Sequence, residues 1–262
     1  MGDISVKNVS FAYKGTDRLI LQDVSMTVRE GDFVCLLGQS GCGKSTFLRL
    51  LAGLERPTQG QLCVNGEEIS GAGFDRAVVF QDYGLFPWMT AGANLMLALK
   101  QRYPEKSKAE RKSTALQFIR EVGLDDSVFD KYPKELSGGM KQRCAIARAF
   151  SLDAPILLMD EPFGALDAVT RSKLQDMVLD LWSREEPKKT VFFVTHDVEE
   201  ALLLATRVMI FGQSPSHVIY SCDVPHKKGA TRQELYGDKE VMELRNELIE
   251  QINQDVAAHS EQ

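Results

Sequence analysis

The residues with the clearest chemical potential form a glycine-rich run that fits the pattern GxxxxGK[ST]. Glycines let a backbone curl so that successive N–H groups face an anion. A helix that follows directs its positive end toward the same anion. The Lys44 ammonium can reach β- and γ-phosphate oxygens, and the Ser45 hydroxyl can coordinate Mg²⁺. The run therefore predicts a nucleotide site made by Gly38, Gln39, Ser40, Gly41, Cys42, Gly43, Lys44, Ser45 and Thr46.

The segments on either side of this run support a nucleotide site. Residues 33–37 are continuously apolar and stop at glycine, which is typical of a strand covered on both faces. Residues 46–51 begin a helical pattern. The alternative is a glycine-rich turn without a ligand, and the order strand, loop, helix disfavours it.

Two adjacent carboxylates, Asp160 and Glu161, follow the apolar strand predicted at residues 156–159. Ligands of open α/β sheets bind at the carboxyl ends of strands. Asp160 suits the task of holding Mg²⁺ through its water shell, and Glu161 can polarise an attacking water. By itself such a pair is usually a solvated turn, but the phosphate loop favours the catalytic interpretation.

A second helix N-terminus suited to an anion is predicted at Ser137-Gly138-Gly139, ahead of the helical residues 144–149. Ser137 is a favourable N-cap, and the two glycines leave backbone N–H groups open. Taken alone, the segment could equally be an ordinary capped helix.

Taken together, these segments resemble the ABC ATPase family, and the similarity covers nearly the whole chain in the family's order. Leu136-Ser137-Gly138-Gly139-Met140 corresponds to the signature, residues 164–167 to the D-loop, and Asp160 with Glu161 to the Walker B acids. The resemblance implies roles for three further residues. Tyr13 would stack on adenine, Gln81 would contact Mg²⁺ and water, and His196 would hold the γ-phosphate and water in line. The implied metal contacts are Ser45, Gln81 and Asp160.

The resemblance also implies an ATPase that binds ATP and Mg²⁺ and works as a head-to-tail homodimer. Each ATP would lie between the phosphate loop of one subunit and Ser137, Gly138 and Gly139 of the other. One departure is Met140, where the family usually has glutamine; its backbone can still serve, so the site is expected to be active.

The expected fold is α/β, with a P-loop NTPase (RecA-like) core, an antiparallel β subdomain and an inserted α-helical subdomain. We expect a single ABC ATPase domain over residues 1–262. Its catalytic core with the β subdomain would span residues 1–82 and 151–262, and its helical subdomain residues 83–150. Apolar residues at helical spacing, Val241, Leu244, Leu248 and Ile252, predict an amphipathic helix near the end, packed on its own domain.

Residues 81–90, with the signature and residues 161–167, look like the nitrate/sulfonate/taurine importer branch. That resemblance implies integral-membrane permease subunits as partners and, indirectly, a solute-binding protein. A groove lined by Leu85, Phe86, Trp88 and Met89 would receive a permease helix; the alternative is that these residues only pack the helical subdomain. The solute itself is not encoded here.

Composition narrows the class of protein further. The chain has 262 residues and a formal net charge of −6, which disfavours a nucleic-acid partner. No apolar run approaches the ~20 residues of a membrane span, and the N-terminus lacks a signal-peptide layout. We expect a cytoplasmic protein, peripheral on the inner face of the cell membrane. The five cysteines include no CxxC pair, which favours reduced thiols.

Three alternatives stay open: an ABC exporter ATPase, a non-transport ABC protein acting on nucleic acid or the ribosome, and a nucleotide-binding module without catalysis. The segment around Phe86 and Trp88 argues against the exporter. A basic face or a long coiled-coil insertion would favour the non-transport ABC protein, and the sequence shows neither. Loss of Glu161 or His196 would favour the module without catalysis, and both residues are present.

Overall fold

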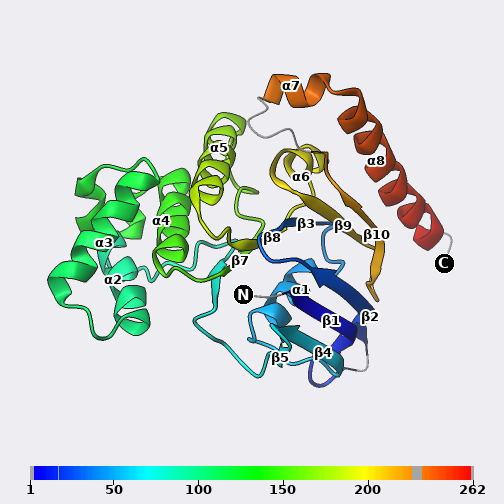
Figure 1. Ribbon diagram of the computed structural model, residues 1–262, viewed down its shortest axis with the longest axis horizontal. Helices are drawn as coiled ribbons and strands as arrows, with labels where there is room; N and C mark the ends of the chain where they lie inside the picture. Colours follow the sequence, from blue (N-terminus) through cyan, green and yellow to red (C-terminus); the bar gives the residue numbers. More distant parts are fainter. Residues whose placement is uncertain (1–2, 17, 226–231, 261–262) are drawn as a thin grey trace. The chain divides into compact units, whose positions relative to one another are not determined.

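The structure is a computed structural model that describes residues 3–16, 18–225 and 232–260. The chain divides into two compact units (Figure 1). Unit 1 consists of Met1–Gly73 with Thr190–Gln262, and unit 2 is Phe74–Lys189. The subdomain boundaries expected from the sequence stay a prediction.

Unit 1 contains an antiparallel sheet of strand order β2-β1-β4-β5. Its strands are β1 (Ile4–Ala12), β2 (Leu19–Val28), β4 (Gln59–Val64) and β5 (Glu67–Glu68). Ile4, Val6, Val9 and Phe11 of β1 are buried. One face of this sheet therefore covers the core of the unit.

The second sheet region of unit 1 has the order β10-β9-β3-β8. It is built from β3 (Phe33–Leu37), β8 (Thr190–Val194), β9 (Arg207–Phe211) and β10 (Val218–Asp223). β3 runs parallel to β8 and β9, whereas β10 is antiparallel to β9. All five residues of β3 are buried, as its continuous apolar run predicts.

Four helices belong to the described part of unit 1: α1 (Lys44–Leu51), α6 (Val198–Leu204), α7 (Arg232–Gly237) and α8 (Lys239–Ser260). Val241 and Leu248 of α8 are buried, and Arg245 pairs with Glu199 of α6. The predicted amphipathic helix therefore exists, and it packs on its own unit.

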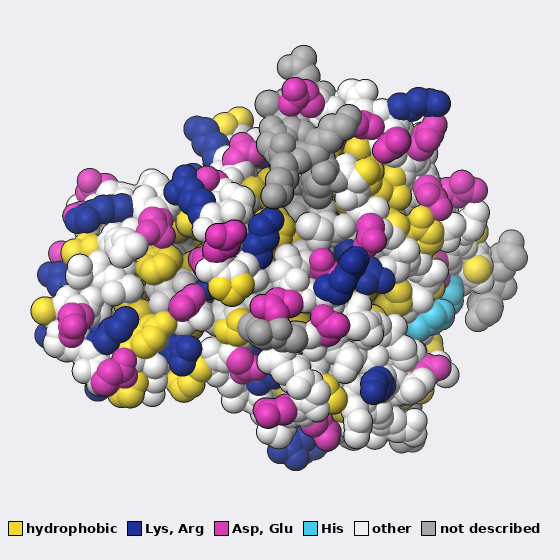
Figure 2. Space-filling model, in the orientation of Figure 1, with side chains coloured by type: hydrophobic (Ala, Val, Ile, Leu, Met, Phe, Trp, Pro, Cys, Tyr) yellow, Lys and Arg dark blue, Asp and Glu magenta, His cyan; other side chains and the backbone are white. Residues whose placement is uncertain are grey.

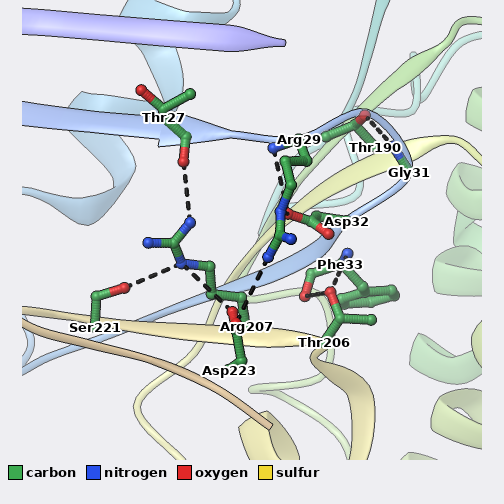
Figure 3. Close-up of polar contacts among 10 residues, drawn as sticks. All are labelled: Thr27, Arg29, Gly31, Asp32, Phe33, Thr190, Thr206, Arg207, Ser221 and Asp223. Atoms are coloured by element: carbon green, nitrogen blue, oxygen red, sulfur yellow. Dashed lines mark hydrogen bonds and ion pairs between the residues drawn. The ribbon is translucent and has the colours of Figure 1, made fainter. Parts of the chain in front are cut away.

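The two sheet regions of unit 1 are joined by the side chain of Arg207 on β9 (Figure 3). Its guanidinium donates to the Thr27 carbonyl of β2 at 3.1 Å and to the Ser221 hydroxyl of β10 at 3.1 Å. Asp223 lies 3.9 Å from Arg207 and 3.6 Å from Arg29. The negative charges of Asp32 and Asp223 balance the positive charges of Arg29 and Arg207. The cluster therefore has no net charge, and its role is structural.

Unit 2 contains two parallel strands, β6 (Arg76–Val79) and β7 (Ile156–Asp160). The segment between them is helical, as predicted, and Figure 1 shows its helices gathered together. Its elements are α2 (Ala91–Arg102), α3 (Lys108–Glu121), η1 (Asp126–Asp130), η2 (Pro133–Glu135) and α4 (Gly138–Ser151), and α5 (Ala168–Arg184) follows β7.

The end of α3 shows how closely local sequence sets these boundaries. Gly123 has φ +71° directly after the last turn, and its N–H donates to the Arg120 carbonyl at 2.8 Å. A left-handed residue at this position closes a helix, and glycine adopts it without a Cβ penalty. Gly123 therefore ends α3 for a reason that its own residue type supplies.

The surface carries both charges in mixture. On the face shown in Figure 2, Lys and Arg side chains are interspersed with Asp and Glu side chains. All five cysteines lie in the described part of the chain, and none of them forms a disulfide bond. No helix among the described residues has the length and apolar character needed to cross a membrane.

Candidate nucleotide-binding and hydrolysis site

The glycine-rich loop connects β3 to α1, as predicted, and two of its glycines are sterically required. Gly38 has φ +150°, and a Cβ on it would lie 2.6 Å from the Phe211 carbonyl oxygen. Gly43 has φ +112°, and its Cβ would lie 2.9 Å from the Leu21 side chain. Both distances are shorter than real Cβ contacts, so the loop can take this path only with glycine at these positions.

The N-terminus of α1 has the properties of an anion site. Its N-cap residue is Gly43, which has no side chain that could cap the first turn. The first N–H groups of a helix have no partner inside the helix and carry its positive dipole end. The loop before α1 is open at Gly41, because a Cβ there would meet nothing within 4 Å. The residues present therefore fit a phosphate group.

Lys44 is only 4% exposed, and its ammonium lies inside the loop. Nζ donates to the carbonyls of Gly38 and Gln39, both at 2.8 Å. The neighbouring Cys42 is buried, and burial raises the pKa of its thiol although Lys44 opposes the shift. Cys42 is thus a neutral packing residue, and the loop carries one buried positive charge.

Tyr13 lies beside α1. Its hydroxyl is 3.1 Å from the Thr46 hydroxyl, and its ring packs edge-on against Phe11 at 4.9 Å between centroids. The side chain is 36% exposed. The ring therefore has a fixed orientation and an accessible surface, which suits the adenine contact implied by the resemblance.

His196 follows β8, the strand that pairs in parallel with β3 through Leu36 and Val194. Carboxyl ends of neighbouring parallel strands meet at one edge of a sheet, so His196 emerges at the same edge as the phosphate loop. The next residue, Asp197, caps α6 by accepting from the N–H groups of Glu199 and Glu200 at 2.9 and 3.2 Å. His196 itself is exposed.

In unit 2, Gln81 and the acidic pair emerge from neighbouring strands. Val79 of β6 pairs with Met159 of β7, and Asp160 is the last residue of β7. Glu161 comes next in the left-handed region, with φ +41°. A non-glycine residue there costs about 1–3 kcal/mol and is concentrated at functional sites. The strain re-aims the chain directly after the strand end.

The signature begins α4 as predicted. The Ser137 hydroxyl accepts from the Met140 N–H at 3.3 Å, so Ser137 is the N-cap. A Cβ on Gly139 would lie 2.7 Å from the Thr170 side chain. Met140, the departure from the family pattern, packs its side chain against a buried cluster. Its side chain therefore serves the packing of unit 2, and its backbone keeps the helix start. The cluster comprises Ala91, Val128, Leu136 and Cys144.

The predicted residues divide between the two units. Unit 1 carries the phosphate loop, Thr46, Tyr13 and His196, whereas unit 2 carries Gln81, Asp160, Glu161 and the signature. The sequence assigned Asp167 to the D-loop but did not predict that it caps α5, where it accepts from the N–H groups of Val169 and Thr170. These hydrogen bonds, with that of Thr170 first, lower the pKa of Asp167. An aspartate before a helical run was the available signal.

Comparison with known proteins identifies the class. The family model described as ABC transporter matches residues 21–164, more than half of the chain. The chain therefore belongs to the ABC transporter family, as an ATP-binding ATPase subunit.

Particular relatives narrow the comparison. The chain is 40% identical to the bicarbonate transport ATP-binding protein CmpD of Synechocystis, over 94% of this chain and 88% of that one. It is 42% identical to the nitrate import ATP-binding protein NrtD of Synechococcus elongatus, over 88% and 83%. The predicted importer branch is confirmed at this level.

Solved structures agree on the fold. A dimeric bacterial ABC transporter cassette, MJ0796, has a TM-score of 0.76 and 33% identity over 86% of this chain and 100% of that chain. The same cassette in a dimeric post-hydrolysis state with ADP and Pi has a TM-score of 0.75 and 32% identity, with the same coverage. The α/β P-loop fold expected from the sequence is thereby confirmed.

Proposed function

We propose that this chain powers import of a small anion through a separate permease, working as a head-to-tail homodimer on the inner face of the cell membrane. The family membership gives the ATPase. The importer names of the relatives favour inward transport, and nitrate and bicarbonate are the anions those names contain. The dimeric cassettes among the solved structures support a dimer.

The observation that carries the proposal is the uncapped start of α1 with its buried ammonium. Gly43 at the N-cap offers the first N–H groups of α1 no side-chain acceptor, and Lys44 is almost fully buried. A bound phosphate would accept from those N–H groups and pair with the buried ammonium. The residues that would contact the nucleotide in this subunit are Tyr13, Gly38, Gln39, Ser40, Gly41, Cys42, Gly43, Lys44, Ser45 and Thr46.

The partner subunit would complete the site with its own signature. Ser137, Gly138 and Gly139 begin α4, whose dipole favours an anion at this end. In hydrolysis, Glu161 would act as the general base toward the attacking water, and His196 would hold that water and the γ-phosphate in line. Gln81 would orient the same water.

Magnesium would be held through Ser45, Gln81 and Asp160. When bound, it would offset negative charge on the β- and γ-phosphates. The donor set, a hydroxyl, an amide and a carboxylate, consists of hard oxygen groups, which are the ligands Mg²⁺ prefers. Ser45 lies in the first turn of α1 and Asp160 at the end of β7.

The permease would dock on the segment before α2. Phe86 is 41% and Trp88 71% exposed, with their ring centroids 5.3 Å apart. Leu85 instead packs against the buried cluster of unit 2. Of the four residues predicted to line the groove, Phe86 and Trp88 thus present exposed apolar surface, which suits an apolar helix from a partner.

The test is reconstitution of the chain with its permease in liposomes, together with the solute-binding protein. We expect ATP hydrolysis that rises when the binding protein carries nitrate or bicarbonate, and uptake of that anion. Stimulation without uptake, or outward transport, would favour the exporter. Stimulation of the purified chain by RNA or DNA instead of the permease would favour a non-transport ABC protein.

A further inference from the structure

The chain makes a strained corner just after Gln81. Tyr83 donates its N–H to the Phe80 carbonyl at 3.0 Å, and then Tyr83 and Gly84 take φ values of +69° and +57°. A tyrosine in this region is uncommon. The Asp82 carboxylate accepts from the Gly84 N–H at 3.2 Å. The path of the backbone that leaves Gln81 is therefore not one that the local sequence would choose freely.

Arg148, from the second half of α4, holds this corner. Its guanidinium donates through Nη2 to the Tyr83 carbonyl at 3.2 Å and through Nη1 to the Gly84 carbonyl. Those are the two carbonyls turned by the left-handed residues. Burial lowers the pKa of Arg148, and the charge of Asp82 opposes that shift. A planar guanidinium suits this task, because its fork can serve two acceptors at once.

The same corner also touches the start of α4. The Tyr83 hydroxyl lies 3.2 Å from the position that a Cβ on Gly138 would occupy. Side chains on a helix lean toward its N-terminus, so Arg148 reaches back along α4 toward the same end. The corner is thus fixed by its backbone to Arg148, while its side chain reaches the first residue of the signature helix.

We propose that Arg148 is a positioning residue that locks the loop carrying Gln81 to the signature helix α4, so that the two act as one body in hydrolysis. The inference rests on the proposed role of Gln81. Arg148 does not touch the nucleotide; it acts through the position of Gln81. The loop that carries Gln81 and the start of α4 would then move together when either of them contacts ATP.

A double-mutant cycle on the full chain tests this, using kcat for ATP hydrolysis with Mg²⁺ at saturating ATP. We expect Arg148→Gln to lower kcat about 10- to 100-fold, the scale of a small misplacement in an active site. We expect KM for ATP to change less than kcat, because the phosphate loop is in the other unit. The double variant Gln81→Ala, Arg148→Gln should be no slower than Gln81→Ala alone.

Two further variants separate positioning from general destabilisation. Arg143 is the matched control: it lies on the same helix but donates to the Val122 carbonyl. Any loss of kcat caused by Arg143→Gln should multiply with the loss caused by Gln81→Ala. If Arg148→Gln fails to fold, Gly84→Ala disturbs the same corner from the other side, because its Cβ would lie 2.9 Å from the Phe80 ring. The loss of kcat caused by Gly84→Ala should also vanish when Gln81 is already replaced by alanine. Arg148→Lys should recover part of kcat.

Multiplicative losses for Arg148→Gln and Gln81→Ala would overturn the inference, as would unchanged kcat in Arg148→Gln. If Gln81→Ala alone keeps wild-type kcat, the role proposed for Gln81 fails. A loss in Arg148→Gln in that case would also overturn positioning through Gln81. The single variant Gln81→Ala therefore separates failure of the proposed role of Gln81 from failure of the positioning role of Arg148.

Discussion

Units 1 and 2 each contain a helix that begins at glycines, α1 and α4, but the two helix starts are built differently. In unit 1, α1 starts from Gly43 without a side-chain cap, directly after a loop of glycines and a buried ammonium. In unit 2, α4 starts from Ser137, whose hydroxyl already satisfies one N–H of the first turn. The start of α1 therefore has no side-chain acceptor at its N-cap, whereas the start of α4 has one N–H group satisfied within the protein.

This difference suggests a division of labour. In the proposed mechanism unit 1 would supply the groups that hold ATP, and unit 2 would supply the base, the Gln81 loop and the signature. Changes in unit 1 should then remove binding together with turnover. Changes in unit 2 outside the magnesium ligands Gln81 and Asp160 should remove turnover and leave binding by the same subunit largely intact.

The largest effect is expected for Lys44→Ala. Removing the ammonium takes away the main countercharge to the β- and γ-phosphates, so binding should fail and kcat should fall to background. Titration with a fluorescent ATP analogue, beside a turnover assay, measures both. Near-normal affinity in the variant would show that unit 1 does not hold ATP through Lys44.

Glu161→Gln tests unit 2 with the shape of the residue kept. Loss of a general base costs about 10²–10⁴-fold in rate, while the Glu161 carboxylate is not needed to hold ATP. The variant should therefore bind ATP, hydrolyse it very slowly and accumulate as a dimer on size-exclusion chromatography with ATP but not with ADP. Asp160→Asn is the contrast, because a lost magnesium ligand should weaken ATP–Mg²⁺ binding itself. Wild-type turnover in Glu161→Gln would remove Glu161 from the mechanism.

Mixing two inactive subunits tests whether the two helix starts complete one site across a dimer. Lys44→Ala carries a defective α1 start, and Ser137→Arg blocks the α4 start. A mixed dimer would have one site with both defects and one with neither, so partial ATPase activity should return. Full activity of either variant alone would contradict the shared site.

Phe86→Glu should act on neither helix start. A buried charge at an apolar interface is costly, so the variant should lose attachment to the permease while its ATP affinity stays unchanged. Phe74→Glu is the matched control, since Phe74 is also an exposed phenylalanine of unit 2, 51% exposed. Copurification with the permease reads out both. Full attachment of the Phe86 variant would assign that residue to packing.

The smallest effect is expected for Ser137→Ala. Losing this cap should cost about 0.5–2 kcal/mol of stability, and each kcal/mol lowers the unfolding temperature of a chain this size by roughly 2–4 °C. Calorimetry measures the shift. An unchanged unfolding temperature would show that α4 does not depend on its cap and that its start resembles that of α1.

Much of this protein is determined by local sequence. The glycine loop, the apolar strand β3, the cap at Ser137 and the terminating Gly123 each follow from neighbouring residues. A missing Cβ, a hydroxyl near an open N–H group and an apolar run have the same consequence wherever they occur. These features were therefore predictable along with the fold class and the candidate site residues.

Other features depend on contacts between residues far apart in the sequence. β10 was not predicted, because Val218–Asp223 is only partly buried and becomes a strand by pairing with β9. Nothing in the sequence near Arg148 indicates that it holds Tyr83, 65 positions away. Glu161 takes its left-handed φ although its own preference opposes it. Only tertiary structure decides such positions, because long-range packing there outweighs local preference.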